Sequence, residues 1–261
     1  MHGALFVAKT GLSAQDTSLK IISNNLANVS TVGFKKDRAV FEDLMYQIQR
    51  QPGAQSAEAS QLPSGLQLGS GVRVAGTQKL FQEGELQNTG ESFDISIQGR
   101  GFWQITMPNG DTGYTRHGQF QLNADGEIVT SEGYLLNPGL TLPDGVQSMS
   151  VSVDGIVSVV LQGDPNPQQI GQLQLADFAN PQGLQNYGQN LYLETAASGN
   201  AVLSNPGEGG TGQLRQGMLE GSNVNAVEEL VNMITTQRAY EMNSKVISTA
   251  DQMLSYVTQN L

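Results

Sequence analysis

The chain has 261 residues, of which 38% are hydrophobic and only 14% are charged, and it contains 31 glycines and no cysteine. This length accommodates one large domain or two modest ones with cores of their own. The net charge of −11 argues against nucleic acid or an anionic membrane surface as a partner, and the lack of cysteine excludes disulfides and thiolate metal sites.

The first predicted element is an amphipathic helix that begins near Leu5. Its apolar side chains recur at alternating steps of three and four residues, a heptad pattern typical of helices that pack along a partner helix. The alternative is a helix that packs only on the core of its own domain. Gly33 stands where a glycine often ends a helix, so we expect the helix to reach the segment around it. The predicted packing residues are Leu5, Leu12, Leu19, Ile22, Leu26 and Val29.

Residues 46–71 are predicted to form an extended arm and not part of a core. The segment is rich in Gln, Ser, Gly and Ala, and it contains Pro52, Gly53, Pro63 and Gly65. The alternative is a disordered linker, but connections are usually about 4–6 residues long. In an assembly of identical chains, such an arm can lie between neighbouring subunits and pair its backbone with theirs.

Residues 72–221 are predicted to form an antiparallel β domain. Asn109-Gly110, Asp125-Gly126 and Asp154-Gly155 each separate two short alternating runs. Such dipeptides are typical of two-residue hairpin turns, in which both central residues take a positive φ. Three of these signals within about fifty residues favour hairpins over any other connection.

The last predicted element is a long helix. Asn223 and Asn225 offer capping side chains ahead of it, and no proline or glycine follows before the chain ends at Leu261. Apolar residues form two stripes on different sides, so the helix must be covered twice. We expect the N-terminal helix to cover one side and another subunit to cover the other. The predicted packing residues here are Val227, Leu230, Val231, Ile234, Tyr240, Ile247 and Leu254.

The predicted fold class is therefore α+β. Residues 1–45 and 222–261 would form a discontinuous coiled-coil domain, followed in the chain by the arm at 46–71 and the β domain at 72–221.

Three candidate chemical sites each have a simpler interpretation. His117 could belong to a Ser–His–Asp triad, but the chain contains no G-x-S-x-G motif that would supply the nucleophilic serine. Asn123, Asp125 and Glu127 lack the spacing of a calcium loop and fit a hairpin turn. Gly99-Arg100-Gly101 precedes a predicted strand, whereas a phosphate-binding loop needs a helix there. We therefore predict no catalytic residue, no cofactor and no metal.

Two long motifs near opposite ends of the chain resemble those of a known family. The segment from Asn24 to Lys35 resembles the N-terminal signature of the bacterial flagellar rod and hook proteins, and the segment from Ser222 to Glu241 resembles their C-terminal signature. The segment from Ile97 to Trp103 resembles a glycine-aromatic stretch of the same family. The motif residues are Asn25, Leu26, Ala27, Asn28, Gly33, Phe34, Asn223, Val224, Asn225, Gln237, Arg238 and Tyr240.

The resemblance implies a structural function. Subunits would polymerise helically into the hollow distal rod of the flagellar basal body, with the helices forming an inner coiled-coil tube and the arm stiffening the rod. It also implies export through the flagellar type III apparatus without a cleaved signal peptide, and a location spanning the periplasm to the outer membrane. The implied partners are further copies of the chain, proximal rod proteins, the hook protein, and the P-ring and L-ring proteins, without nucleic acid or membrane insertion.

Three alternatives remain open. A proximal rod protein of the same family would differ mainly in the arm. A secreted β-domain binding module would stay monomeric and would not need its terminal helices. A hydrolase would lose activity on substitution of His117.

Overall fold

The computed structural model describes residues 2–51, 55–57, 60–61 and 64–259. The chain divides into two compact units, and we describe each by itself. The first unit, here called the helical unit, comprises Met1–Ala27, Asp37–Gln78 and Asn225–Leu261. The second, called the β unit, comprises Asn28–Lys36 and Lys79–Val224. The whole segment 46–71 that was expected to form the arm thus belongs to the same unit as both terminal helices.

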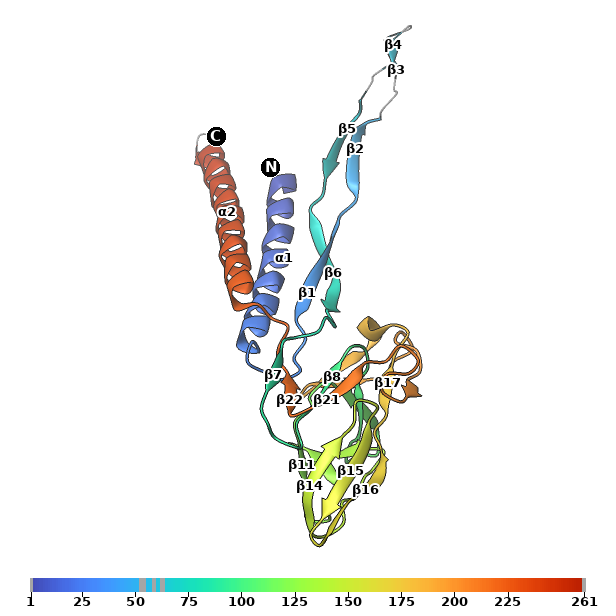
Figure 1. The fold of residues 1–261 in the computed structure, drawn as a ribbon. Coiled ribbons are helices and arrows are strands. Elements are labelled where there is room, and N and C mark those ends of the chain that lie inside the picture. Colours follow the sequence, from blue (N-terminus) through green and yellow to red (C-terminus); the bar gives the residue numbers. More distant parts are fainter. Residues whose placement is uncertain (1, 52–54, 58–59, 62–63, 260–261) are drawn as a thin grey trace. The chain divides into compact units, whose positions relative to one another are not determined.

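The helical unit contains two antiparallel helices, α1 (His2–Ala27) and α2 (Ala226–Gln259) (Figure 1). Gly11 lies against Asn243, and Asn25 lies against Glu229. The sequence order of these partners is reversed, as an antiparallel pair requires. None of the described helices combines the length and the hydropathy needed to cross a membrane.

The start of α2 follows the capping prediction, whereas the end of α1 does not. Asn225 Oδ1 accepts hydrogen bonds from the N–H groups of Val227, at 3.0 Å, and Glu228, at 3.3 Å. The helix α1 ends at Ala27, because Thr31 and Asn28 form a local turn in which Thr31 N donates to Asn28 O at 3.2 Å. The prediction that Val29 continues the heptad pattern is therefore wrong.

The strands that follow α1 in the chain, from Asp37 onward, form a two-stranded ribbon. The first half of the ribbon pairs with its second half. Arg38 contacts Gln78, and Arg73 forms an ion pair with Glu42 at 2.7 Å, so the ribbon is antiparallel at its base. Further along, Tyr46 pairs with Gly69 and Gln47 with Leu68. The paired strands are β1 (Asp37–Asp43) with β6 (Val72–Lys79), β2 (Tyr46–Arg50) with β5 (Leu66–Gly69), and β3 (Gln55–Ala57) with β4 (Ser60–Gln61).

The β unit is built on a seven-stranded sheet with the strand order β11-β12-β13-β9-β10-β19-β18. Every pairing in this sheet is antiparallel. Its strands are β9 (Trp103–Thr106), β10 (Thr112–Thr115), β11 (Phe120–Leu122), β12 (Ile128–Thr130), β13 (Leu135–Asn137), β18 (Gln185–Gly188) and β19 (Leu191–Leu193).

A three-stranded antiparallel sheet and three strand pairs complete this unit. The sheet consists of β14 (Val146–Val151), β15 (Ile156–Leu161) and β16 (Asp164–Gln172). A short 3-10 helix occupies Pro181–Gly183. The pairs are β17 (Leu175–Asp177) with β20 (Val202–Ser204), β8 (Ile95–Gln98) with β21 (Gln213–Gln216), and β7 (Leu86–Asn88) with β22 (Met218–Glu220).

All three predicted hairpins are present, but their turns differ from the expected type. Only the glycines have a positive φ, with 85° at Gly110, 77° at Gly126 and 83° at Gly155. In each turn the glycine N–H donates to the carbonyl three residues earlier, as Gly126 does to Asn123 at 3.1 Å. This is a three-residue loop in which a type I turn is followed by a left-handed glycine.

The core of the β unit lies around Trp103, Ile105, Val157, Val159 and Leu173, all fully buried. A second cluster is aromatic, and the rings of Tyr114, Phe178, Phe102 and Tyr192 meet edge to face at centroid distances of 4.8–5.9 Å. Such pairs stabilise a core beyond the area that they bury.

Candidate assembly surface

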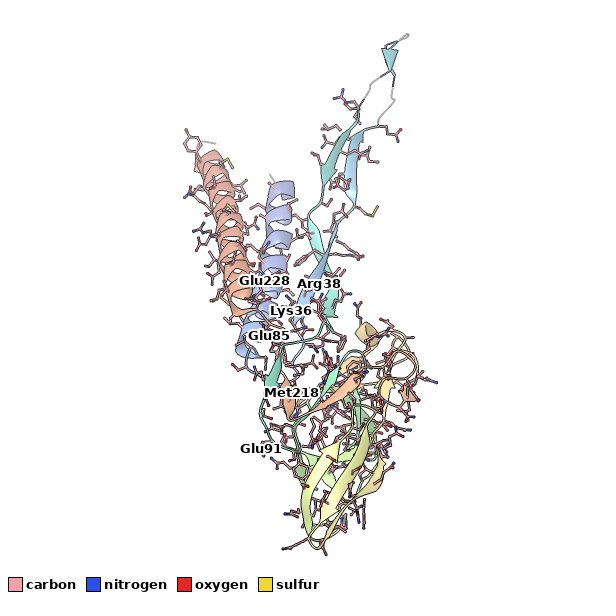
Figure 2. The ribbon with its side chains drawn as sticks, in the orientation of Figure 1. Lys36, Arg38, Glu85, Glu91, Met218 and Glu228 are labelled. Atoms are coloured by element: carbon pink, nitrogen blue, oxygen red, sulfur yellow. The ribbon has the colours of Figure 1, made fainter. Side chains whose placement is uncertain are left out.

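One side of α2 carries a row of exposed apolar side chains, which is interrupted by the exposed Arg238. Val227 is 70% exposed, Ile234 is 50% exposed and Met242 is 64% exposed. Figure 2 shows the side chains that stand out along this helix. Exposed apolar rows on soluble proteins commonly mark sites of protein contact. We call this row the outer stripe, and its members are Val227, Val231, Ile234, Met242, Val246 and Met253.

The opposite side of α2 faces α1. Glu229, Asn243 and Ala250 follow at intervals of fourteen and seven residues, and both Glu229 and Ala250 are buried. Of the predicted packing residues, Ile247 and Leu254 are half-buried on this side. Leu230 and Tyr240 are more than two-fifths exposed within the same chain. The structure therefore covers one of the two predicted stripes only in part.

On α1, the structure buries Ile22 and half-buries the predicted leucines. Ala8 and Ala14 are more deeply buried than any of these leucines. Small side chains let two helices approach closely, and Gly11 illustrates this because a Cβ there would lie 3.0 Å from the amide nitrogen of Asn243. Ala14 was not predicted, since alanine gives only a weak hydrophobic signal. The half-buried leucines are Leu5, Leu12, Leu19 and Leu26.

The motif residue Asn25 ties the end of α1 to two other segments of the helical unit. Its Nδ2 donates to Asp37 O at 2.8 Å, and its Oδ1 accepts from Asp37 N at 2.9 Å. The same Nδ2 lies 3.4 Å from Glu229 Oε2. Both Asn25 and Glu229 are buried, so these bonds satisfy polar groups that would otherwise destabilise the unit. The burial of Glu229 was not predicted, because an acid in the first helical turn is usually exposed.

Motif residues Gly33 and Phe34 sit in the β unit, next to the strand that precedes α2 in sequence. Gly33 has a φ of 70° and donates to Glu220 O at 2.7 Å. Phe34 is buried, and Lys79 Nζ lies 5.1 Å from its ring centroid. The left-handed backbone of Gly33 thus serves a packed turn and not the end of a helix.

Asn223 joins the same region through both ends of its side-chain amide. Its Oδ1 accepts from Lys36 N at 2.7 Å, and its Nδ2 donates to Leu80 O at 2.8 Å. Val224 beside it is buried. These contacts bring together segments that are almost two hundred residues apart, so no local pattern in the sequence predicts them.

A buried charge cluster, also unpredicted, includes Lys35, which is next to Lys36 in the chain. Lys35 Nζ lies 2.5 Å from Glu220 Oε1, and Arg116 Nε lies 3.6 Å from Glu220 Oε2. All three side chains are at least 97% buried. Burial lowers the pKa of Lys35, the Glu220 carboxylate opposes this change, and Arg116 adds to it. Buried charges of this kind require their partners, because an isolated one is strongly destabilising.

The remaining predicted residues are exposed or half-buried, or they fall outside the described part. Asn28 is half-buried, whereas Ala27, Gln237 and Arg238 are exposed. Gly65 is half-buried just before β5. Pro52, Gly53 and Pro63 lie outside the described residues.

The ribbon also presents exposed apolar side chains. Met45 is 88% exposed, and Tyr46, Ile48, Leu66 and Leu68 are all more than two-fifths exposed. A two-stranded ribbon has an unpaired edge on each strand and is marginally stable by itself. The ribbon and the outer stripe together give the helical unit two surfaces suited to protein contact.

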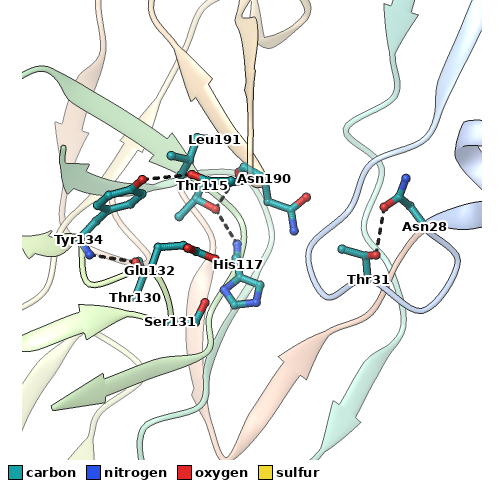
Figure 3. Close-up of a pocket in the computed structure, with 11 residues that line it drawn as sticks. Asn28, Thr31, Thr115, His117, Thr130, Ser131, Glu132, Tyr134, Asn190 and Leu191 are labelled. Carbon is teal, nitrogen blue, oxygen red and sulfur yellow. Dashed lines mark hydrogen bonds between the residues drawn. The ribbon is translucent and has the colours of Figure 1, made fainter. Parts of the chain in front are cut away.

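His117 lies in a polar pocket of about 280 Å³ in the β unit (Figure 3). Its backbone N–H donates to Thr115 Oγ1 at 3.0 Å, and its ring lies near Ser131 and Glu132. Burial lowers the pKa of His117, although Asp94 and Glu132 oppose this change. Among the described residues no hydrogen bond joins this ring to Ser131, so the pocket lacks the nucleophile–base pair of a hydrolase.

The other two candidate sites have structural roles. Asn123 Oδ1 accepts from the N–H groups of Asp125 and Glu127, and its Nδ2 donates to Glu127 Oε2 at 2.9 Å. These groups close a hairpin turn. Arg100 O accepts from Gly212 N at 2.6 Å, so the Gly99–Gly101 segment pairs with another part of the backbone. In the part of the chain that the structure describes, no group of three or more potential metal ligands occurs.

Comparison with known families gives three matches along the chain. Residues 5–35 match the family described as "Flagella basal body rod protein". Residues 96–159 match "Flagellar hook protein FlgE/F/G D1 domain", and residues 215–260 match "Flagellar basal body rod FlgEFG protein C-terminal".

Full-length relatives agree with these matches. The flagellar basal-body rod protein FlgG of Buchnera aphidicola subsp. Schizaphis graminum is 54% identical over 99% of this chain and 100% of its own length. FlgG of Caulobacter vibrioides is 49% identical, with 98% of both chains covered. The flagellar basal-body rod protein FlgF of Caulobacter vibrioides is 33% identical, over 100% of this chain and 98% of its own. The higher identity to FlgG separates this chain from that paralogue.

Proposed function

Because this chain belongs to the family of flagellar basal-body rod proteins, with FlgG-like sequence over its full length, we propose that it polymerises helically into the hollow distal rod. Members of this family are structural, so the chain is a structural subunit of the basal-body rod and not an enzyme. Polymerisation explains the surface found on α2, which a monomer would leave in water.

The exposed outer stripe of α2 is the observation that carries this proposal. Burying one valine, leucine or isoleucine side chain contributes about 1.5–3 kcal/mol, and each subunit has several such residues in the stripe. We propose that α1 and α2 form the coiled coil of one subunit and that the outer stripe packs against a neighbouring subunit. In this arrangement the discontinuous domain of residues 1–45 and 222–261 would build the inner tube.

The outer part of the ribbon, residues 46–71, is the proposed stiffening arm. Its exposed apolar side chains and its open strand edges could both be covered by a neighbouring copy. Contacts of that kind would oppose sliding between adjacent rows of subunits, which bending of a rod requires. Gly65, and the residues Pro52, Gly53 and Pro63 outside the described part, belong to this proposed arm.

The proposed location is the distal rod from the periplasm to the outer membrane. There the β domain of residues 72–221 would face outward, towards the P-ring and L-ring proteins. Proximal rod proteins and the hook protein would adjoin the two ends of the polymer. Export would occur through the flagellar type III apparatus, and the lack of cysteine supports this route because no disulfide has to be opened before export.

The substitution Ile234→Asp tests the proposal directly. It places a carboxylate in the middle of the outer stripe, where assembly would have to remove that charge from water. Ser244→Asp is the matched control, because Ser244 is an exposed residue of α2 outside the stripe. Both variants add one aspartate to the same helix, so they share any loss of helix propensity.

We expect Ile234→Asp to abolish polymerisation of the purified chain and motility of the cell, and Ser244→Asp to preserve both. Circular dichroism and the fluorescence of Trp103 should be unchanged in the two monomers. Normal rods formed by Ile234→Asp would contradict the proposed contact of the outer stripe.

A further inference from the structure

A pocket of the helical unit is lined by residues of α1, β1 and α2. It has a volume of about 210 Å³. Ile21, Ile22 and Phe41 give it apolar walls, and polar or charged side chains line much of the rest. A pocket of this kind suits a side chain that has an aliphatic stem and a charged end. The charged residues of its lining are Asp37, Arg38 and Glu229.

Glu229 brings to this pocket a carboxylate that has no cationic partner among the described residues. The residue is only 4% exposed. Its Oε2 lies 3.4 Å from the neutral amide nitrogen of Asn25, and its Oε1 accepts no hydrogen bond from any described residue. Burying a charge is costly unless an opposite charge accompanies it, so this carboxylate favours a cation in the pocket.

Arg38, although it lines the same pocket, is directed to another partner. Its Nε and Nη2 donate to Gln78 Oε1 at 2.8 Å and 2.6 Å. Asp37 adds a second carboxylate to the lining, so two acids and one arginine are present among the residues described there. The pocket therefore carries a net negative charge and would attract a cationic side chain.

Arg238 is the cation that interrupts the outer stripe. It lies about one helical turn after Ile234 and one turn before Met242, both of which belong to the stripe. Its side chain is exposed, and its guanidinium forms neither a hydrogen bond nor an ion pair within the part of the chain that the structure describes. If the outer stripe packs against a neighbouring subunit, Arg238 leaves water with it and needs an acidic partner there.

Arg238 cannot pair with Glu229 of its own chain. The two residues are about two and a half turns apart on α2, so they lie on opposite sides of the helix. Glu229 faces α1, whereas Arg238 shares the exposed side with Ile234 and Met242. An ion pair between these residues must therefore join two copies. Since each copy offers both partners, the contact can repeat along a polymer.

We propose that Arg238 of one subunit enters this pocket of a neighbouring subunit and pairs with Glu229 there. The walls formed by Ile21, Ile22 and Phe41 would cover the aliphatic stem of the arginine, and its guanidinium would donate to Glu229 Oε1. This inference rests on the proposed polymerisation. It adds the partner that the charge within the outer stripe requires.

A double-mutant cycle on the critical concentration for polymerisation of the full chain tests the pairing. Arg238→Gln removes the cation, and Glu229→Gln removes the carboxylate but keeps an acceptor for the amide of Asn25. Arg238→Lys retains the positive charge. Lys245→Gln is the matched control, because Lys245 is an exposed cation two helical turns further along the same side of α2. Circular dichroism of each monomer checks that the helices are retained.

We expect Arg238→Gln and Glu229→Gln each to raise the critical concentration about tenfold or more, and the double variant to raise it no further than either single variant does. Arg238→Lys should raise it less than Arg238→Gln does. The effect of Lys245→Gln should simply multiply with that of Glu229→Gln, because these two residues are not paired.

Three results would overturn the pairing even though the parent chain polymerises. They are an unchanged critical concentration in Arg238→Gln, equal effects of Arg238→Lys and Arg238→Gln, and effects of Arg238→Gln and Glu229→Gln that multiply in the double variant. A parent chain that stays monomeric would instead refute the proposed function, and the pairing with it.

Discussion

Gly33 occupies a place where any side chain would collide with backbone. Its φ is 70°, and an added Cβ would lie 2.9 Å from the carbonyl carbon of Arg116. Gly90 has a similar φ of 73°, but open space surrounds the position of its Cβ. Substituting each glycine by alanine and comparing the two losses of stability therefore distinguishes the cost of backbone strain from the cost of steric collision.

We predict that Gly33→Ala lowers the free energy of unfolding of the β unit by about 2–4 kcal/mol. Gly90→Ala should cost only the left-handed strain, about 1–2 kcal/mol. Urea unfolding followed by the fluorescence of Trp103, which is fully buried in the β unit, measures both effects. Equal losses in the two variants would show that the contact with Arg116 is not tight.

Tyr114 should make the stability of the β unit fall at high pH. Burial, with the carboxylate of Glu194 nearby, raises the pKa of Tyr114 from 10.0 to about 12. Between pH 10 and pH 12 the unfolded chain has therefore lost a proton that the folded chain retains. The free energy of unfolding falls as the pH rises through this window, and this contribution of Tyr114 is fully present below pH 10.

The variant Tyr114→Phe should lose this part of the pH dependence. Tyr187→Phe, at an exposed tyrosine, should retain it. Urea midpoints measured from pH 9 to pH 12 provide the comparison, and subtracting the parent curve removes contributions from other groups such as Lys35. Parallel curves for the parent and Tyr114→Phe would contradict the perturbed phenol.

At the scale of elements, the ribbon that follows α1 in the chain differs most from the short loops that usually connect secondary-structure elements. It pairs with itself from β1 and β6 outward to β3 and β4, and it places residues such as Met45 and Ile48 in solvent. A ribbon that pairs internally can be shortened without breaking the strands at its base. Its function can therefore be tested separately from the stability of the helical unit.

We predict that deletion of residues 51–62 leaves export and the β unit intact but gives a rod that bends. The deletion removes the outer part of the proposed arm and keeps β2 and β5, which can be joined by a short turn. Electron microscopy of basal bodies measures the curvature, and Trp103 fluorescence checks the β unit. A straight rod of normal stiffness would reduce the arm to a linker.

The helices and hairpins could be predicted because their signals are local. Asn225 caps α2 through contacts within three residues, and the Gly110, Gly126 and Gly155 turns depend on neighbouring residues alone. The end of α1 was missed because the turn between Asn28 and Thr31 competes with a helix through one side-chain hydroxyl. The spacing of apolar residues carries no information about that competing hydrogen bond.

For the whole molecule, the unpredicted features are those that join distant segments. The cluster of Lys35, Arg116 and Glu220 draws on three places in the chain, and β8 pairs with β21 across more than a hundred residues. The motif residues Asn25 and Asn223 could be singled out by family resemblance, but their partners could not. Sequence periodicity therefore identified the apolar stripes of the two helices, whereas the long-range contacts at the ends of these helices have no local signal in the sequence.

Cryo-electron microscopy of the polymer formed by the purified full-length chain is the most direct test of the central claim. The proposal predicts a straight, hollow helical tube whose inner wall consists of α1 and α2, with the outer stripe of each α2 against a neighbouring subunit and the β unit outside. A chain that stays monomeric at high concentration, or a polymer with the outer stripe in solvent, would contradict it.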